Sequence, residues 1–319
     1  MAEEVSFLVD GVEVKADLYL PPDLKPGERR PAIVAGHGFA FVKEGLTPQG
    51  AFFSAAGYIV LAIDYRSFGR SGGAVRGELF PERQMEDFSA GLSYLQTRPD
   101  VEPDRIAFWG TSFGGALVLG AGARDRRARV IVAQVPIVDG SRWMQWLRTP
   151  EQWEALLDAL DEDRTRRIKG EPGARIPIAR HFNSTELNAM PTDDGVLKFM
   201  ALLDTMVESW RPDITLESME KIIAFRPIHS IAEISPRPLC IIMNTGYEAL
   251  HPRDQVMEAY AAASEPKKLV LLPYDQLGFY AEPGATDALR SALDFFEEHL
   301  PVGEQRGGAI PRSKFDLPG

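Results

Sequence analysis

The segment Gly110-Thr111-Ser112-Phe113-Gly114 carries the residues best suited to chemistry. It matches the pattern G-x-S-x-G, in which a serine lies between two glycines, and it follows an apolar stretch at 106–109. Between a strand and a helix, small neighbours permit a sharp turn that projects the serine hydroxyl in a strained conformation. We therefore predict that Ser112 is a nucleophile and that the N-terminus of the following helix stabilises developing negative charge.

A phosphate-binding turn is the alternative interpretation of a glycine-rich strand-to-helix junction. That chemistry is typical of a G-x-G-x-x-G pattern or of a lysine after the glycines, and this segment has neither. The sequence favours the nucleophile.

Two segments together resemble the α/β hydrolases, and the resemblance covers nearly all of residues 5–300. One is the serine motif, and the other is Gly36-His37-Gly38-Phe39, which resembles the oxyanion loop after the third strand of that family. The resemblance implies that the backbone N–H groups of Phe39 and Phe113 hold the oxyanion, while His37 supports the loop. Residues 64–71 (DYRSFGRS) resemble the family's D-x-R-G-x-G-x-S turn, which is mainly architectural.

The resemblance also implies a carboxylate after the seventh strand. Residues 244–252 (NTGYEALHP) resemble the family's G-x-x-D-x-x-x-P loop, and Glu248 stands four residues before Pro252. A carboxylate there would orient a histidine and stabilise its protonated form. Asp139, at the end of the expected sixth strand, is the alternative acid.

The sequence departs from the family where the catalytic base is expected. In the family a histidine follows the eighth strand in a loop resembling P-G-D-H-F, whereas residues 272–278 read LPYDQLG, with Gln276 in its place. A neutral amide cannot accept the serine proton at a useful pKa, so Ser112 would lack its activator.

Three explanations of Gln276 stay open. It is an engineered replacement that leaves a folded, inactive variant, or the protein has left ester hydrolysis for another reaction. The third explanation, which we rank behind these two, is a base supplied by His251, His229 or His181. For each of these histidines, taken singly, we expect a structural or surface role.

Strand and helix patterns alternate along most of the chain. Apolar runs predict strands at 5–9, 12–20, 32–35, 58–63, 106–109, 130–135, 239–243 and 268–272. Helices are predicted at 48–57, from Pro81, after the serine motif, and at 253–262 and 286–300. Such alternation predicts an α/β-hydrolase fold with a mostly parallel central sheet and helices on both faces.

The alternation stops after the predicted sixth strand, which divides the chain. We predict a core at 1–138 and 231–300, a helical lid without strands at 139–230, and a loosely held tail at 301–319. Aromatic rings and thioethers suit a bulky apolar ligand. We therefore expect a substrate pocket formed by Trp143, Trp146, Met206 and Trp210, although such residues also suit the lid's own core.

The overall composition limits the partners. The 35 Lys and Arg residues against 46 Asp and Glu give a net charge of −11, which disfavours nucleic acid and anionic membranes. A single cysteine, Cys240, excludes an internal disulfide and suits a reducing compartment. We expect a cytoplasmic enzyme with a small-molecule substrate, no cofactor and no metal, and we leave a homodimer open.

These features give three functional hypotheses. The first is a serine esterase that removes an acetyl or other short acyl group from a bulky apolar metabolite. The second is a lyase or cyclase on the same scaffold, such as one that eliminates acetate from a polyketide-type product and uses the oxyanion hole for an enolate or a departing carboxylate. The third is a binding protein without catalysis, which an intact serine motif disfavours.

Overall fold

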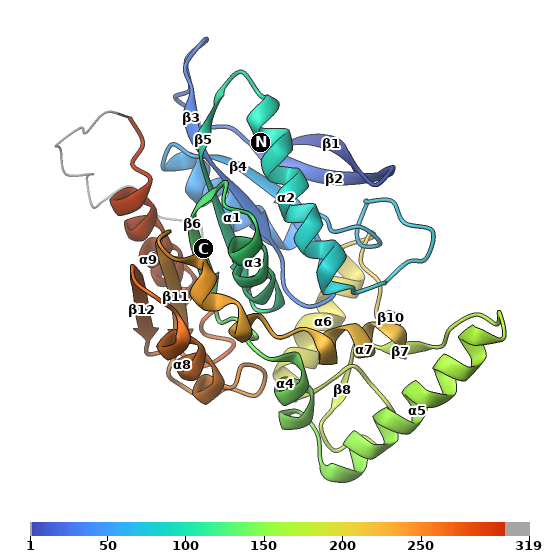
Figure 1. The fold of residues 1–319 in the computed structure, drawn as a ribbon. Coiled ribbons are helices and arrows are strands. Elements are labelled where there is room, and N and C mark those ends of the chain that lie inside the picture. The colour runs from blue at the N-terminus through green and yellow to red at the C-terminus, as the bar shows by residue number, and fades with distance from the viewer. Residues whose placement is uncertain (1, 304–319) are drawn as a thin grey trace.

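A single eight-stranded sheet forms the centre of the computed structural model, which describes residues 2–303 (Figure 1). The strand order is β1-β2-β4-β3-β5-β6-β11-β12. The strands are β1 Glu3–Val9, β2 Val12–Tyr19, β3 Arg30–Gly36, β4 Ile59–Ile63, β5 Val101–Thr111, β6 Ala128–Gln134, β11 Leu239–Asn244 and β12 Lys267–Leu272. Within this sheet only the pairs β1–β2 and β2–β4 are antiparallel, so the predicted mostly parallel sheet is confirmed. The carboxyl ends of its parallel strands meet at one edge, where such sheets place their sites.

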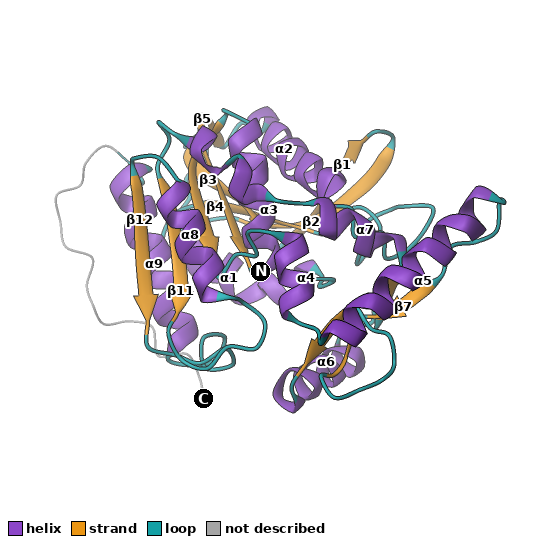
Figure 2. Ribbon diagram, turned by 60° about the horizontal axis from the view of Figure 1, so that its bottom comes forward, coloured by secondary structure: helices purple, strands orange, loops and turns teal. Residues whose placement is uncertain are grey.

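Helices cover both faces of this sheet (Figure 2). On one face α1 (Thr47–Ala55) and α9 (Gly284–His299) contact each other. On the other face α2 (Pro81–Thr97) packs on α3 (Phe113–Arg124), and both contact β5. The helix α8 (Arg253–Ala262) and α3 share contacts with the short helix η3 (Ile231–Ile234).

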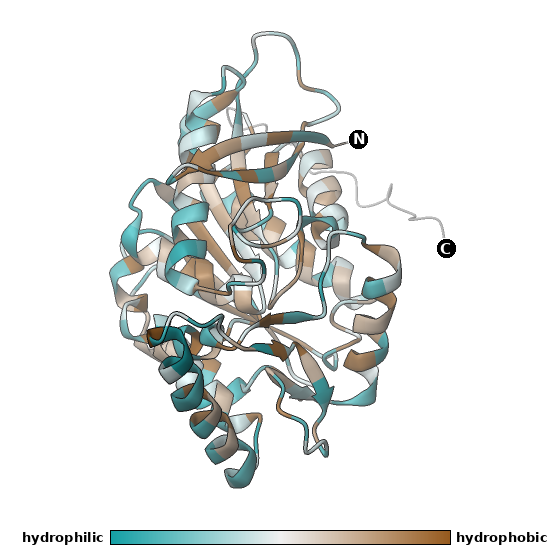
Figure 3. Cartoon of the chain, turned by 90° about the vertical axis from the view of Figure 1, so that its right-hand side faces the viewer, coloured by the Kyte–Doolittle hydropathy of each residue, from teal (hydrophilic) through white to brown (hydrophobic). Residues whose placement is uncertain are grey.

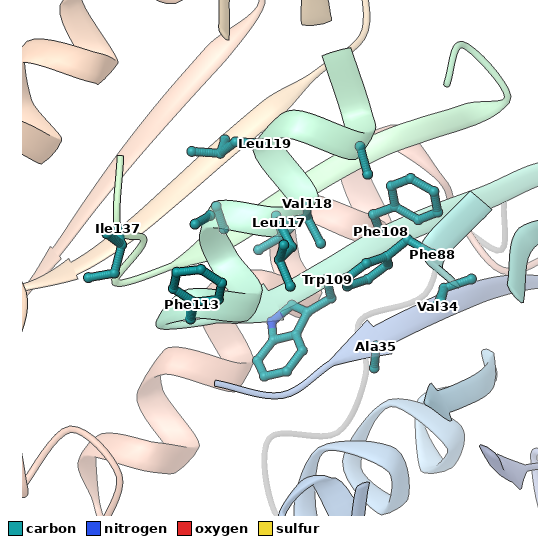
Figure 4. Packing of buried hydrophobic residues seen from close by; sticks show 14 of the residues in the cluster. Val34, Ala35, Phe88, Phe108, Trp109, Phe113, Leu117, Val118, Leu119 and Ile137 are labelled. Carbon is teal, nitrogen blue, oxygen red and sulfur yellow. The ribbon is translucent and has the colours of Figure 1, made fainter. Parts of the chain in front are cut away.

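The central strands are apolar on both sides because both sides are covered. Every residue of β3 and of β4 is buried, which is why these segments lack the alternating pattern of a half-exposed strand. In Figure 4 the side chains of Leu117 and Val118 on α3 lie over β5, near Trp109. This packing fixes the junction between β5 and α3, where Ser112 lies.

The chain between β6 and β11 departs from the sheet, and α5 with β7 projects away from it (Figure 1). This insertion contains the helices α4 Gly140–Trp146, α5 Pro150–Ile168, α6 Asp194–Met206, α7 Glu217–Ala224, η2 Pro227–His229 and η3. It also contains the short strands β7 Arg175–Pro177, β8 Ala179–His181, β9 Met190–Thr192 and β10 Asp213–Thr215. The expectation of an insertion without strands was wrong. Three-residue strands are too short to show a period in the sequence.

Hydrogen bonds join the insertion to loops of the core. The Trp210 indole N–H donates to the Ala40 carbonyl at 2.9 Å, and the Leu79 N–H donates to Ser218 Oγ at 2.9 Å. The outer helix α5 is largely hydrophilic (Figure 3). The division into core and lid stays a prediction. Of the tail expected at 301–319, residues 304–319 lie outside the described part of the chain.

Candidate active site

Ser112 forms the turn between β5 and α3. Its backbone has φ 56° and ψ −120°, a conformation that is strained for a residue with a side chain. A Cβ on Gly110 would lie 2.2 Å from the Gly114 carbonyl oxygen, and a Cβ on Gly114 would lie 2.4 Å from the His37 carbonyl oxygen. Both flanking positions therefore require glycine, as the G-x-S-x-G pattern indicated.

His251 is the imidazole that contacts this serine. Its Nε2 lies 2.9 Å from Ser112 Oγ, and its side chain is only 3% exposed. Our expectation of a surface or merely structural role for His251 does not fit this contact, and a base supplied from elsewhere in the chain stays a prediction. Sequence spacing placed the residue at the rim of the fold, but the loop after β11 turns inward and buries it.

The carboxylate of Glu248 shapes this loop. Its Oε1 accepts the backbone N–H of Leu250 at 2.8 Å and of His251 at 3.1 Å, and its Oε2 accepts the side-chain amide of Asn244 at 3.0 Å. The chain thus folds around the carboxylate and brings His251 Nδ1 to 3.0 Å from Oε1. These two atoms lie at ion-pair distance without the alignment of a hydrogen bond.

The surroundings of Glu248 keep it ionised. Burial by itself would raise its pKa, but the electrostatic effect of the neighbouring His251 and the hydrogen bonds from Leu250 and Asn244 outweigh burial and lower the pKa below its ordinary value. An ionised Glu248 can stabilise a proton on His251.

Gln276 makes no hydrogen bond to Ser112 in the described part of the chain. Its side-chain oxygen accepts the backbone N–H of Ala249 at 2.8 Å, and its amide nitrogen donates to Asp193 Oδ2 at 2.6 Å. Our placement of Gln276 at the position of the base is therefore corrected. The side-chain oxygen thus binds the loop after β11, and the side-chain nitrogen binds the insertion. The imidazole beside the serine comes from the loop after β11 instead.

The segment at 36–39, which resembles an oxyanion loop, lies against the serine. A Cβ on Gly38 would lie 3.3 Å from Ser112 Cβ. Phe113 is the first residue of α3, where the helix supplies no acceptor for the backbone N–H. The Phe39 N–H also has no backbone acceptor among the residues described. These two N–H donors therefore lack a backbone acceptor among the described residues, and their role as an oxyanion hole stays a prediction.

The side chains of Phe39 and Phe113 belong to a cluster of aromatic rings. Phe39 packs edge-on against Phe113 and Trp143, with ring centroids 5.7 and 5.5 Å away, and Phe113 also contacts Phe225. Trp143 is buried, and its indole N–H donates to the Leu250 carbonyl at 2.6 Å, next to His251.

The three other residues expected in the pocket have different surroundings from those of Trp143. Trp146 and Met206 are 44% and 72% exposed, whereas Trp210 is buried and lines a cavity of about 170 Å³ with Leu197 and Met200. Their role in a substrate pocket stays a prediction.

The other candidate acids and bases have local roles. Asp139 caps α4, where its Oδ1 accepts the Arg142 N–H at 3.0 Å. His181 Nδ1 accepts the Asn183 N–H at 3.2 Å, and His229 is exposed in η2. None of the three has a hydrogen bond to Ser112 within residues 2–303.

Two signals for this site were present in the sequence. The spacing Glu-x-x-His at 248–251 brings a carboxylate and an imidazole onto one loop, and we gave it too little weight. We missed Asn244 and Asp193 entirely. Asn244 ends an apolar strand, a common place for a site residue, but no sequence signal connects Asp193 with Gln276, since 83 positions separate them.

Residues 10–275 match the X-Pro dipeptidyl-peptidase (S15) family. The chain belongs to this family. Its members are α/β hydrolases, so the predicted fold is confirmed and the chain is placed among the hydrolases.

Three relatives show what this S15-family chain is similar to. Thiohydrolase aneE of Aspergillus aculeatus is 28% identical over 273 residues, which make up 83% of each chain. Polyketide transferase grgF of a Penicillium species is 24% identical over 92% of this chain and 94% of its own, and the GrgF crystal structure gives a TM-score of 0.79. Uncharacterized protein PA2218 of Pseudomonas aeruginosa is 32% identical over 91% of this chain and 78% of its own, and its crystal structure gives a TM-score of 0.77.

No group of three or more His, Cys, Asp and Glu side chains in residues 2–303 is placed to hold a metal ion. No helix in that range has the length and apolar character needed to cross a membrane.

Proposed function

We propose that the protein is a serine-dependent acyl hydrolase or acyl transferase with the triad Ser112, His251 and Glu248. The observation that carries this proposal is the 2.9 Å contact between Ser112 Oγ and His251 Nε2, behind which Glu248 is buried and ionised. The nucleophile, base and orienting carboxylate are the roles that acyl transfer requires.

The proposed reaction begins with proton transfer from Ser112 Oγ to His251 Nε2 as the oxygen attacks the acyl carbonyl. The backbone N–H groups of Phe39 and Phe113 hold the negative oxygen of the tetrahedral intermediate. His251 then gives its proton to the departing alkoxide or thiolate, which leaves the acyl group on Ser112. Water, or an alcohol acceptor in a transferase, then attacks the acyl-enzyme as His251 takes its proton. The bond between Ser112 Oγ and the acyl group breaks, and His251 returns the proton to Ser112 Oγ, which releases the acid or the new ester.

The proposed substrate is an ester or thioester of a bulky apolar metabolite. Phe39, Phe113, Trp143 and Phe225 form an aromatic cluster that includes both residues of the proposed oxyanion site. Such rings suit a large apolar group better than a sugar. The names thiohydrolase and polyketide transferase of the relatives support a thioester or polyketide-type acyl group.

Acetate elimination is the second candidate from the sequence, and the histidine contact argues for acyl transfer instead. Elimination needs a base for a carbon-bound proton and no activated serine. His251 Nε2 is directed at Ser112 Oγ, where it activates an oxygen nucleophile.

The first test compares hydrolysis of p-nitrophenyl butyrate and of a butyryl thioester by the wild type and variants. Neither substrate can lose its acyl group by elimination of acetate. We expect Ser112→Ala and His251→Ala each to lower kcat by ~10³- to 10⁶-fold. Gln276→His should not raise it, because position 276 faces Ala249 and Asp193. His229→Ala, which changes an exposed histidine, is the control and should keep wild-type activity.

The result that would contradict the proposal is equally direct. If Ser112→Ala retains the wild-type rate on both substrates, Ser112 is not the nucleophile. A large gain from Gln276→His would instead mean that position 276 supplies the base.

A further inference from the structure

Gln276 holds the loop that carries the proposed acid and base. Its backbone N–H donates to the Tyr247 carbonyl at 2.9 Å, and its side-chain oxygen accepts the Ala249 N–H at 2.8 Å. These two bonds lie on either side of Glu248. Because Gln276 is only 4% exposed, water competes little with them.

The other end of the same amide reaches the insertion. Its Nε2 donates to Asp193 Oδ2 at 2.6 Å, while Asp193 Oδ1 accepts the Val196 N–H at 3.0 Å and caps α6. The neighbouring Leu277 packs on the same helix start, since a Cβ on Gly195 would lie 2.6 Å from Leu277 Cδ1. The amide thus joins the start of α6 to the loop around Glu248.

We propose that Gln276 is a positioning residue through which the insertion sets the geometry of Glu248 and His251. This inference rests on the proposed function. The 2.9 Å contact of His251 with Ser112 depends on where the 247–251 segment lies, and Gln276 fixes that segment relative to α6. The insertion therefore influences acylation of Ser112 even for a substrate that it does not touch.

The chemistry of the amide explains why this position suits glutamine. One acceptor and one donor diverge from a single planar group, and here each meets a partner of opposite kind. A carboxylate at 276 could still accept the Ala249 N–H but would face the Asp193 carboxylate. An amide at 193 would restore a donor to that carboxylate while its own oxygen still caps α6.

This reciprocity gives a sharp test. Gln276→Glu, Asp193→Asn and the double variant are compared with wild type for kcat and KM on p-nitrophenyl butyrate and for the rate at which a fluorophosphonate labels Ser112. We expect Gln276→Glu to lower kcat and labelling by ~10- to 100-fold and Asp193→Asn to lower both by a few-fold, with KM little changed. The double variant should return to within ~3-fold of wild type, since the lost coupling is of the size seen between contacting residues.

Asp194→Asn is the matched control. It removes the same charge one residue along, from an exposed side chain that does not contact Gln276, and should label like wild type. Melting temperatures of all variants separate unfolding from mispositioning, because a variant that is folded but slowly labelled has lost geometry alone.

The outcomes separate this inference from the proposed function. Recovery in the double variant supports the inference. If wild type is labelled at Ser112 but the single variants match it, or if the double variant is as slow as Gln276→Glu, the inference is overturned and the proposed function stands. If wild type is neither labelled nor active, both are overturned.

Discussion

His37 shows how a single buried side chain contributes to the pH dependence of folding stability. Burial lowers its pKa from 6.5 to about 4, although its Nδ1 contacts the Gly38 carbonyl. Between these values the unfolded chain binds a proton at His37 and the folded chain does not, so the contribution of His37 to folding stability falls as the pH is lowered through that window. The loss is about 3 kcal/mol when complete. We expect His37→Gln to remove this contribution to the pH dependence of the unfolding free energy. Urea unfolding of the variant and of wild type between pH 7 and 4.5 measures the difference. His229→Gln should follow the wild-type curve. If the unfolding free energy of His37→Gln changed with pH in parallel with that of wild type, His37 would take up its proton as readily in the folded chain as in the unfolded chain.

The proposed oxyanion site depends on how α3 packs against the loop after β3. A Cβ on Gly114 would lie 2.4 Å from the His37 carbonyl oxygen and 2.5 Å from that of Gly36, so Gly114→Ala must push the loop that carries Phe39 away from Ser112. Because neither backbone can yield cheaply, we expect a loss of about 2 kcal/mol in unfolding free energy and at least ~10-fold in kcat. Urea unfolding and p-nitrophenyl butyrate hydrolysis measure both. Gly45→Ala is the control, since its Cβ would meet only a Phe41 ring carbon at 3.5 Å. Equal behaviour of the two variants would refute the contact.

The docking of the insertion on the core is a property of the whole molecule. Trp210 is buried and donates to the Ala40 carbonyl, one residue after Phe39, so it joins the insertion to the proposed oxyanion loop. Trp210→Phe keeps most of the packing and should lower the free energy of unfolding by about 1 kcal/mol. Trp210→Ala also leaves a cavity and should cost about 3–5 kcal/mol. Trp146→Phe, at a side chain that is 44% exposed, should stay within about 0.5 kcal/mol of wild type. Chemical denaturation ranks the three, and a Trp210→Ala variant as stable as Trp146→Phe would show that the insertion is not docked through this residue.

The sequence by itself determined the sheet, its covering helices and the serine turn. Buried parallel strands leave continuous apolar runs, as in β3 and β4, and a strained turn leaves glycines on both sides of Ser112. These signals are local, since each element's pattern reflects its own burial and backbone geometry. The same locality explains what was missed, because three-residue strands such as β7 and β8 leave no period to detect.

Only the tertiary structure decided which imidazole meets Ser112 and what Gln276 does. His251 turns inward because backbone N–H groups of its own loop converge on the Glu248 carboxylate, and that convergence depends on the path of the loop rather than on residue type. Gln276 finds Asp193 across 83 positions of sequence. Contacts between distant segments carry no periodicity along the chain, so they become visible only when the strands and the insertion are placed in space.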